Sequence, residues 1–194
     1  YVDPASPEFG VVLIEFSRMS TAYDGELRLV VQAPAELSPA GRDALIAMHA
    51  AGQQGKRREM FALLVKWRQT WLTGGALAVA VSRGEEMGLD LELFRQSLER
   101  TAIRDVDAEV AWADERGLSG ALAFNGRRYF DMIESVPLDA ATRLTLEQAN
   151  GLMDTGTART NLYATAAAHN TALAPFGRPF RDSEIIPVGK SPSF

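Results

Sequence analysis

The residues that usually carry chemistry are scarce in this sequence. It contains no cysteine, which excludes an internal disulfide, a thiolate nucleophile and a sulfur-ligated metal from these 194 residues. Its two histidines, His49 and His169, lie far apart and have no acidic partners at metal-ligand spacing. From the sequence we therefore predict no catalytic residue, no metal site and no cofactor.

The charged and aromatic residues that could form a binding site have simpler interpretations. Trp67 and Trp71 lie one helical turn apart and could form a ligand platform, but their spacing favours a place in the core. Residues 56–58 (Lys-Arg-Arg) open a predicted helix at the end that disfavours positive charge. That position suggests a partner surface, but a solvated surface is favoured. On a helix face, His49 is predicted to be a hydrogen-bonded structural residue rather than a ligand.

Composition and charge are those of an ordinary globular protein. Hydrophobic residues make up 46% of the chain and charged residues 23%. The net charge of −5, with a pI near 5.1, gives no electrostatic reason to expect nucleic acid or an anionic membrane as a partner. No apolar stretch approaches the roughly 18 residues of a membrane span. No signal peptide opens the chain, although a mature or excised domain would have lost one.

The pattern of apolar residues predicts strands on both sides of a helical block. Residues 11–16 and 26–31 are short apolar runs typical of strands. An Asn-Gly pair at 125–126 separates the apolar runs 121–124 and 127–130, which predicts a β-hairpin. The order of strand, strand, helices, hairpin and helix indicates an α/β protein with a helical block between its two strand pairs.

The predicted helices have recognisable start signals and apolar faces. Ser38 followed by Pro39 predicts the start of one helix, and Asp90 is the predicted cap of another. Further helices are predicted over residues 76–87, 104–116, 138–152 and 161–173. An apolar stripe at helical spacing is predicted to pack against Phe94 and Leu98; it consists of Met60, Leu63, Leu64, Trp67 and Trp71.

Five segments of the sequence follow one another in a specific order. They are Leu13–Ser17, Ala22–Val30, Ala47–Lys56 with Glu59-Met60, Ala113–Gly120 and Asn125–Arg127. On these segments, which lie within residues 11–170, the chain resembles the DsbA-like thioredoxin-fold family of thiol-disulfide oxidoreductases. The resemblance implies an α/β thioredoxin-like fold with an inserted helical domain, a protein or peptide substrate, and a periplasmic or otherwise exported location.

The resemblance also implies a division of the chain into five parts. These are an extended lead-in (1–10), a first thioredoxin-fold half (11–55), a helical insertion (56–117), a second half (118–174) and an extended tail or linker (175–194). The last residues, 188–194, repeat the Ser-Pro-x-Phe pattern of residues 2–9. Chance in a tail rich in proline and serine is one explanation. We favour the other, that the tail leads into a neighbouring domain of the same fold.

The residues that carry the family's chemistry are missing from this chain. The Cys-x-x-Cys motif should follow Ser17, and a cis-proline should follow Gly120, but neither is present. By the resemblance, a groove for substrate or partner would be formed by Ser17, Arg18, Met19, Ser20, Ser119, Gly120, Ala121 and Leu122. Two functions follow. The chain is either an oxidoreductase domain whose active-site segment is missing from these residues, or a redox-inactive thioredoxin-fold interaction or sensor domain that binds peptides or a protein partner.

The spacing of the first two predicted strands leaves two structural alternatives. Only nine residues, 17–25, separate Phe16 from Glu26. A parallel crossover, which the family fold requires here, needs about a dozen or more residues. Either the two strands pair antiparallel and the fold departs from the family, or a segment near Met19 is missing. We favour the missing segment.

Overall fold

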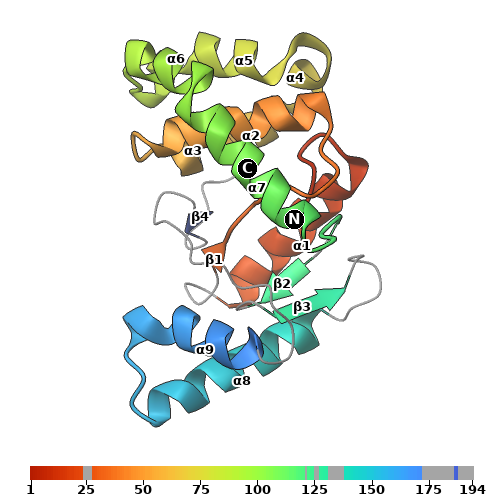
Figure 1. Cartoon of the computed structure of the whole chain (residues 1–194), viewed down its shortest axis with the longest axis vertical. Coiled ribbons are helices and arrows are strands. Elements are labelled where there is room, and N and C mark those ends of the chain that lie inside the picture. Colours follow the sequence, from red (N-terminus) through yellow and green to blue (C-terminus); the bar gives the residue numbers. More distant parts are fainter. Residues whose placement is uncertain (24–27, 121, 125–126, 131–137, 172–185, 188–194) are drawn as a thin grey trace. The chain divides into compact units, whose positions relative to one another are not determined.

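A computed structural model describes residues 1–23, 28–120, 122–124, 127–130, 138–171 and 186–187 (Figure 1). Its elements in chain order are α1 (Pro7–Ala22), β1 (Arg28–Leu29), α2 (Pro39–Gly52), α3 (Arg57–Lys66), α4 (Arg68–Gly74), α5 (Ala76–Arg83), η1 (Glu85–Met87), α6 (Leu91–Glu99), α7 (Thr101–Asp114), β2 (Leu122–Phe124), β3 (Arg127–Phe130), α8 (Leu138–Asp154), η3 (Arg159–Asn161), α9 (Leu162–Thr171) and β4 (Ile186–Pro187). The chain divides into two compact units, residues 1–119 with 181–194 and residues 120–180. Within the described ranges, no helix combines the length and the apolarity that a membrane crossing requires.

The first unit is built around α2, which contacts α3, α5, α6 and α7 (Figure 1). Every residue from Ala44 to Gly52 is buried. Four of these nine residues are alanines, and their small side chains let neighbouring helices approach α2 from several sides. The core of this unit therefore forms between helices.

The start signals predicted for α2 and α6 are confirmed. The Ser38 Oγ accepts a hydrogen bond from the Gly41 backbone N–H at 3.1 Å, and Pro39 occupies the first helical position. The Asp90 carboxylate accepts bonds from the backbone N–H groups of Glu92 and Leu93 at 3.0 and 3.1 Å. Both helices thus begin where a side chain satisfies backbone donors that have no partner within the helix.

The predicted apolar stripe is buried, but it lies on two helices instead of one. Met60, Leu64 and Trp71 are fully buried, and the other members lie at the edge of the same core as Phe94 and Leu98. The helix is interrupted at Trp67, between α3 and α4. The Trp71 indole N–H donates to the Leu64 carbonyl oxygen at 2.7 Å. A carbonyl group near the end of α3 is therefore satisfied by a core side chain.

The prediction of a strand over residues 11–16 is wrong, because this segment lies within α1. A continuous apolar run fits a buried strand or a helix equally well until a start signal or a face decides between them. Pro7 stands at the first position of α1, and Phe9 and Met19 are buried on one of its faces. The Phe9 ring packs edge-on against the Phe61 ring of α3, with 6.2 Å between the ring centroids. Helical packing on α3 therefore replaces the predicted strand.

The α/β thioredoxin-like fold is also contradicted. The described strands form two separate antiparallel pairs, β1 with β4 and β2 with β3, and no parallel sheet is formed among the described residues. Of the predicted strand 26–31, the structure describes residues 28–31; among these, residues 28–29 pair, and they pair with 186–187. With a helix at residues 7–22, the first strand of a thioredoxin sheet is lost, and the parallel pairing that depends on it cannot form.

The second unit contains the predicted hairpin and the last two long helices. β2 pairs antiparallel with β3 on either side of the Asn-Gly pair, which confirms the hairpin, and the register shifts between Leu122 and Ala123. α8 contacts β2, α9 contacts β3, and the two helices contact each other. Both helices begin and end within a few residues of their predicted bounds.

Hydrogen bonds attach the segment that precedes α1 to the body of the first unit. The Asp3 carboxylate accepts hydrogen bonds from the backbone N–H groups of Ala5 (2.8 Å) and Ser38 (3.0 Å). The Arg68 guanidinium donates to the carbonyl oxygens of residues 4, 5 and 6. These contacts fix the start of α1 against α2 and α4, inside the segment predicted to be an extended lead-in.

Replacing Leu64 with alanine tests the helical core. Leu64 is buried between α3 and its neighbours, so Leu64→Ala should lower the free energy of unfolding by about 2–5 kcal/mol. The matched control is Leu93→Ala on α6, where the side chain is 55% exposed and the change should stay within about 0.5 kcal/mol. Urea unfolding followed by circular dichroism gives both values. Similar small losses for the two variants would contradict the proposed core.

Two glycine-to-alanine substitutions test the docking of Asp3. A Cβ atom at Gly41 would lie 1.7 Å from the Asp3 Oδ1, so Gly41→Ala must displace the carboxylate and break its hydrogen bonds. The lost bonds should outweigh the helix-propensity gain and leave a net destabilisation of up to about 1 kcal/mol. A Cβ at Gly10 of α1 meets no atom within 4 Å, so Gly10→Ala should stabilise by roughly 0.5–1 kcal/mol. Thermal unfolding that shows equal stabilisation by both would rule out this docking.

Candidate functional site

The residues predicted to form a groove fall in both units. Ser17 to Ser20 lie near the C-terminal end of α1, and Ser17 and Arg18 are exposed while Met19 is buried. Ser119 and Gly120 are exposed, but Ser119 belongs to the first unit and Gly120 to the second. Leu122 is in β2, and Ala121 lies outside the described residues. The groove stays a prediction, and only its α1 part can be described as one surface.

The exposed side of α1 carries an aliphatic pair. Val11 is 44% exposed and Ile14 is 70% exposed, and they lie three residues apart on one face of the helix. We call the exposed residues Pro7, Val11, Ile14, Arg18 and Thr21 the α1 outer face. Phe9 and Met19 lie on the opposite, buried side of the helix. The helix thus has one buried side and leaves two large aliphatic side chains accessible on the other.

The two ends of the α1 outer face have opposite charge. Glu8, at the N-terminal end, is fully exposed, and hydrogen bonds from its own backbone N–H and from the Ser6 side chain hold the pKa of its carboxyl group below the usual value. It is therefore ionised at neutral pH and complements the positive end of the helix dipole. Arg18, exposed near the C-terminal end, supplies the positive charge. The aliphatic pair lies between the two.

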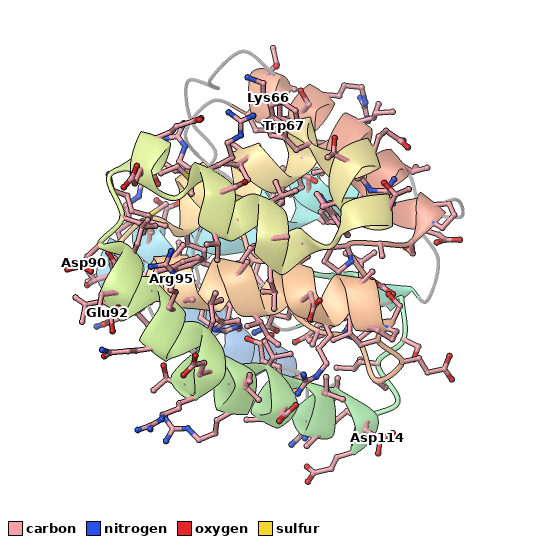
Figure 2. All side chains as sticks on the ribbon, turned by 90° about the horizontal axis from the view of Figure 1, so that it is seen from above. Lys66, Trp67, Asp90, Glu92, Arg95 and Asp114 are labelled. Carbon is pink, nitrogen blue, oxygen red and sulfur yellow. The ribbon has the colours of Figure 1, made fainter. Side chains whose placement is uncertain are left out.

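Two tryptophans lie at the edge of the first unit beside arginines. The Arg83 guanidinium lies 4.7 Å from the centre of the Trp67 ring and pairs with Glu86 at 2.6 Å (Figure 2 labels Trp67 beside Lys66). The Arg116 guanidinium lies 4.3 Å from the Trp112 ring, which also stacks with the Tyr1 ring. In each case a cation of the chain itself occupies a ring face that a ligand would need. Neither tryptophan therefore presents a ligand platform.

A buried carboxylate connects α2, α7 and the segment before α2. The His49 Nε2 lies 3.0 Å from the Glu109 Oε1, and the two side chains are 3% and 4% exposed. The atoms are at ion-pair distance, although the direction from Nε2 is not that of a hydrogen bond. The Glu109 Oε2 accepts a hydrogen bond from the Ala33 backbone N–H at 3.1 Å. Close by in sequence, the Val31 carbonyl oxygen accepts a bond from the buried Arg57 guanidinium at 3.2 Å.

This buried pair is structural. An imidazole beside a carboxylate is an arrangement used in general acid–base catalysis, but catalysis requires hydrogen-bond reach to a substrate. Burial of both side chains prevents that reach, so His49 has a structural place as predicted, although its Nε2 does not make the predicted hydrogen bond. The solvated surface predicted for residues 56–58 is wrong for Arg57, because this side chain is buried and binds a backbone carbonyl group.

The sequence contained a signal for both buried charges. Glu109 shares a face of α7 with Ala102, Val106 and Ala113, all of which are buried. Arg57 shares a face of α3 with Met60, Phe61 and Leu64. A single charged residue within an apolar helical stripe indicates a buried polar contact.

Comparisons with protein-family models, with curated proteins and with solved structures found no match for this chain. Its site is therefore interpreted from its own geometry. Among the described residues, no group of histidine and acidic side chains is placed to hold a metal ion.

Substitution of Glu109 tests whether the buried pair supports the fold. Glu109→Ala removes the acceptor of the Ala33 N–H and leaves His49 without its carboxylate, so it should cost about 3–5 kcal/mol of unfolding free energy. Glu109→Gln keeps an acceptor oxygen and should cost less. Glu99→Ala, at an exposed position on α6, should change stability by less than about 0.5 kcal/mol. Equal values for Glu109→Ala and Glu99→Ala in urea unfolding would show that the buried pair does not hold the unit together.

Proposed function

We propose that this chain is an interaction domain without thiol chemistry, which binds a helical segment of a protein partner on the α1 outer face. The observation that carries the proposal is the aliphatic pair, Val11 and Ile14, one helical turn apart and both exposed. The remaining exposed large aliphatic residues of the described chain are Leu93 on α6 and Leu144 on α8, and neither has such a neighbour on its helix. Single exposed aliphatic residues are normal on protein surfaces, whereas adjacent ones favour docking.

The charges around the pair specify the chemistry of the partner. An acidic side chain fits opposite Arg18 and a basic one opposite Glu8, because complementary charges steer association and fix its orientation. The matching ligand is an amphipathic helix with two aliphatic residues one turn apart, an acidic residue at the end that meets Arg18 and a basic residue at the end that meets Glu8. Of the residues predicted from the sequence to form the groove, Arg18 belongs to this surface and Ser17 precedes it on α1.

Disulfide oxidoreductase chemistry does not form part of the proposal. Thiol–disulfide exchange requires an attacking thiolate, and these 194 residues contain no cysteine. The helical first unit also lacks, in its described part, the parallel sheet that would support a thioredoxin-type site. The exported location implied by the family resemblance stays a prediction.

A designed peptide tests the proposed surface. The probe is a fluorescently labelled helical peptide with two isoleucines one turn apart, a glutamate one turn before them and a lysine one turn after. Fluorescence anisotropy should show binding to the wild-type chain and at least a tenfold weaker affinity for Ile14→Asp, because a buried carboxylate would oppose docking. Leu93→Asp is the matched surface control and should bind as the wild type does. Equal binding to both variants would contradict the proposed docking surface.

A further inference from the structure

The α1 outer face has the spacing of a coiled-coil seam. Its residues recur at intervals of four, three, four and three: Pro7, Val11, Ile14, Arg18 and Thr21. This is the a/d pattern that two helices use when they pack along their length. The seam is apolar only over its central part and is bordered by charge. Its length and composition therefore suit docking with one other helix.

We propose that the helix docked on this face is α1 of a second copy of the chain, paired antiparallel about a two-fold axis that passes between Val11 and Ile14. This inference rests on the proposed function and names its partner. A two-fold interface requires a surface that is complementary to itself. The α1 outer face meets this requirement because its aliphatic pair is central and its ends carry opposite charges.

The antiparallel register follows from the positions of the side chains. With the axis between the aliphatic residues, Val11 packs against Ile14 of the second copy, and Ile14 packs against its Val11. Arg18 then lies over the turn that carries Pro7 and Glu8 of the second copy, within reach of an ionised carboxylate. A parallel register would place the two Arg18 side chains opposite each other, which is unfavourable. The charges thus select one orientation.

The size of the interface sets the expected affinity. α1 has 16 residues and is about 24 Å long. Two aliphatic layers along such a helix bury much less than the ~800 Å² per partner of a standard interface. We therefore expect a reversible dimer with a dissociation constant above about 10 µM. Such an affinity allows the face to exchange a second copy for another partner with the same pattern.

Sedimentation of the whole chain tests the dimer. Analytical ultracentrifugation from about 10 µM to 1 mM should show a concentration-dependent shift from monomer to dimer. Ile14→Asp should weaken the dimer at least tenfold, while Leu93→Asp should leave it unchanged. Arg18→Glu and Glu8→Arg should each weaken it about threefold or more, and the double variant should recover it. Circular dichroism verifies that each variant is folded. A monomer at every concentration, or a dimer unaffected by Ile14→Asp, would overturn the proposal.

Cysteine cross-linking tests the register, because the chain has no cysteine of its own. Val11→Cys and Ile14→Cys are prepared with tags of different mass, mixed in equal amounts and oxidised. The antiparallel register predicts that the mixed dimer exceeds the sum of the two homodimers, which random pairing would only equal. An excess of homodimers would overturn that register. If the chain stays monomeric but the designed peptide binds, the second copy is excluded and the docking surface stands. If the chain stays monomeric and the designed peptide does not bind, or if Ile14→Asp weakens neither association, both proposals fail.

Discussion

The buried Glu109 carboxylate links three parts of the first unit through polar contacts: α2, α7 and the segment that precedes α2. It lies against His49 of α2, extends from α7 and accepts a hydrogen bond from the backbone of Ala33. Val31 lies two residues before Ala33, and its carbonyl oxygen accepts a hydrogen bond from the Arg57 guanidinium of α3. In a sheet, a neighbouring strand would bond these backbone groups, and here side chains from helices do so. The segment before α2 can therefore pass through a helical core without a sheet around it.

The need to pair and hydrogen-bond the buried Glu109 carboxylate also favours the way the helices pack around this segment. α2 is buried over its last nine residues, and its alanines let α3, α5, α6 and α7 approach it. A buried carboxylate is costly unless it is paired and hydrogen-bonded, and both conditions are met only when α2, α7 and the segment at Ala33 are in place. The polar contacts thus favour one arrangement of the helices. Apolar packing alone would specify that arrangement less strictly.

The surface proposed for binding depends on this arrangement indirectly. α1 is held through Phe9 against α3, through Asp3 at the start of α2, and through Arg68 of α4. These contacts orient the helix, so that the residues which do not face the core form the α1 outer face. A helix that is already formed loses less conformational entropy on docking than an unfolded segment, which helps a small aliphatic pair to support reversible association.

Local sequence signals determined several features correctly. Ser38 with Pro39 started α2, Asp90 capped α6, the Asn-Gly pair joined β2 to β3, and the stripe from Met60 to Trp71 was buried. Each depends on residues close together in the chain. The apolar run at 11–16 could form a strand or a helix, and the packing of the neighbouring Phe9 against Phe61, together with the contacts of the preceding segment, decided for a helix. The burial of Glu109 and Arg57 was likewise decided by tertiary structure, because their partners lie 76 and 26 residues away in the sequence.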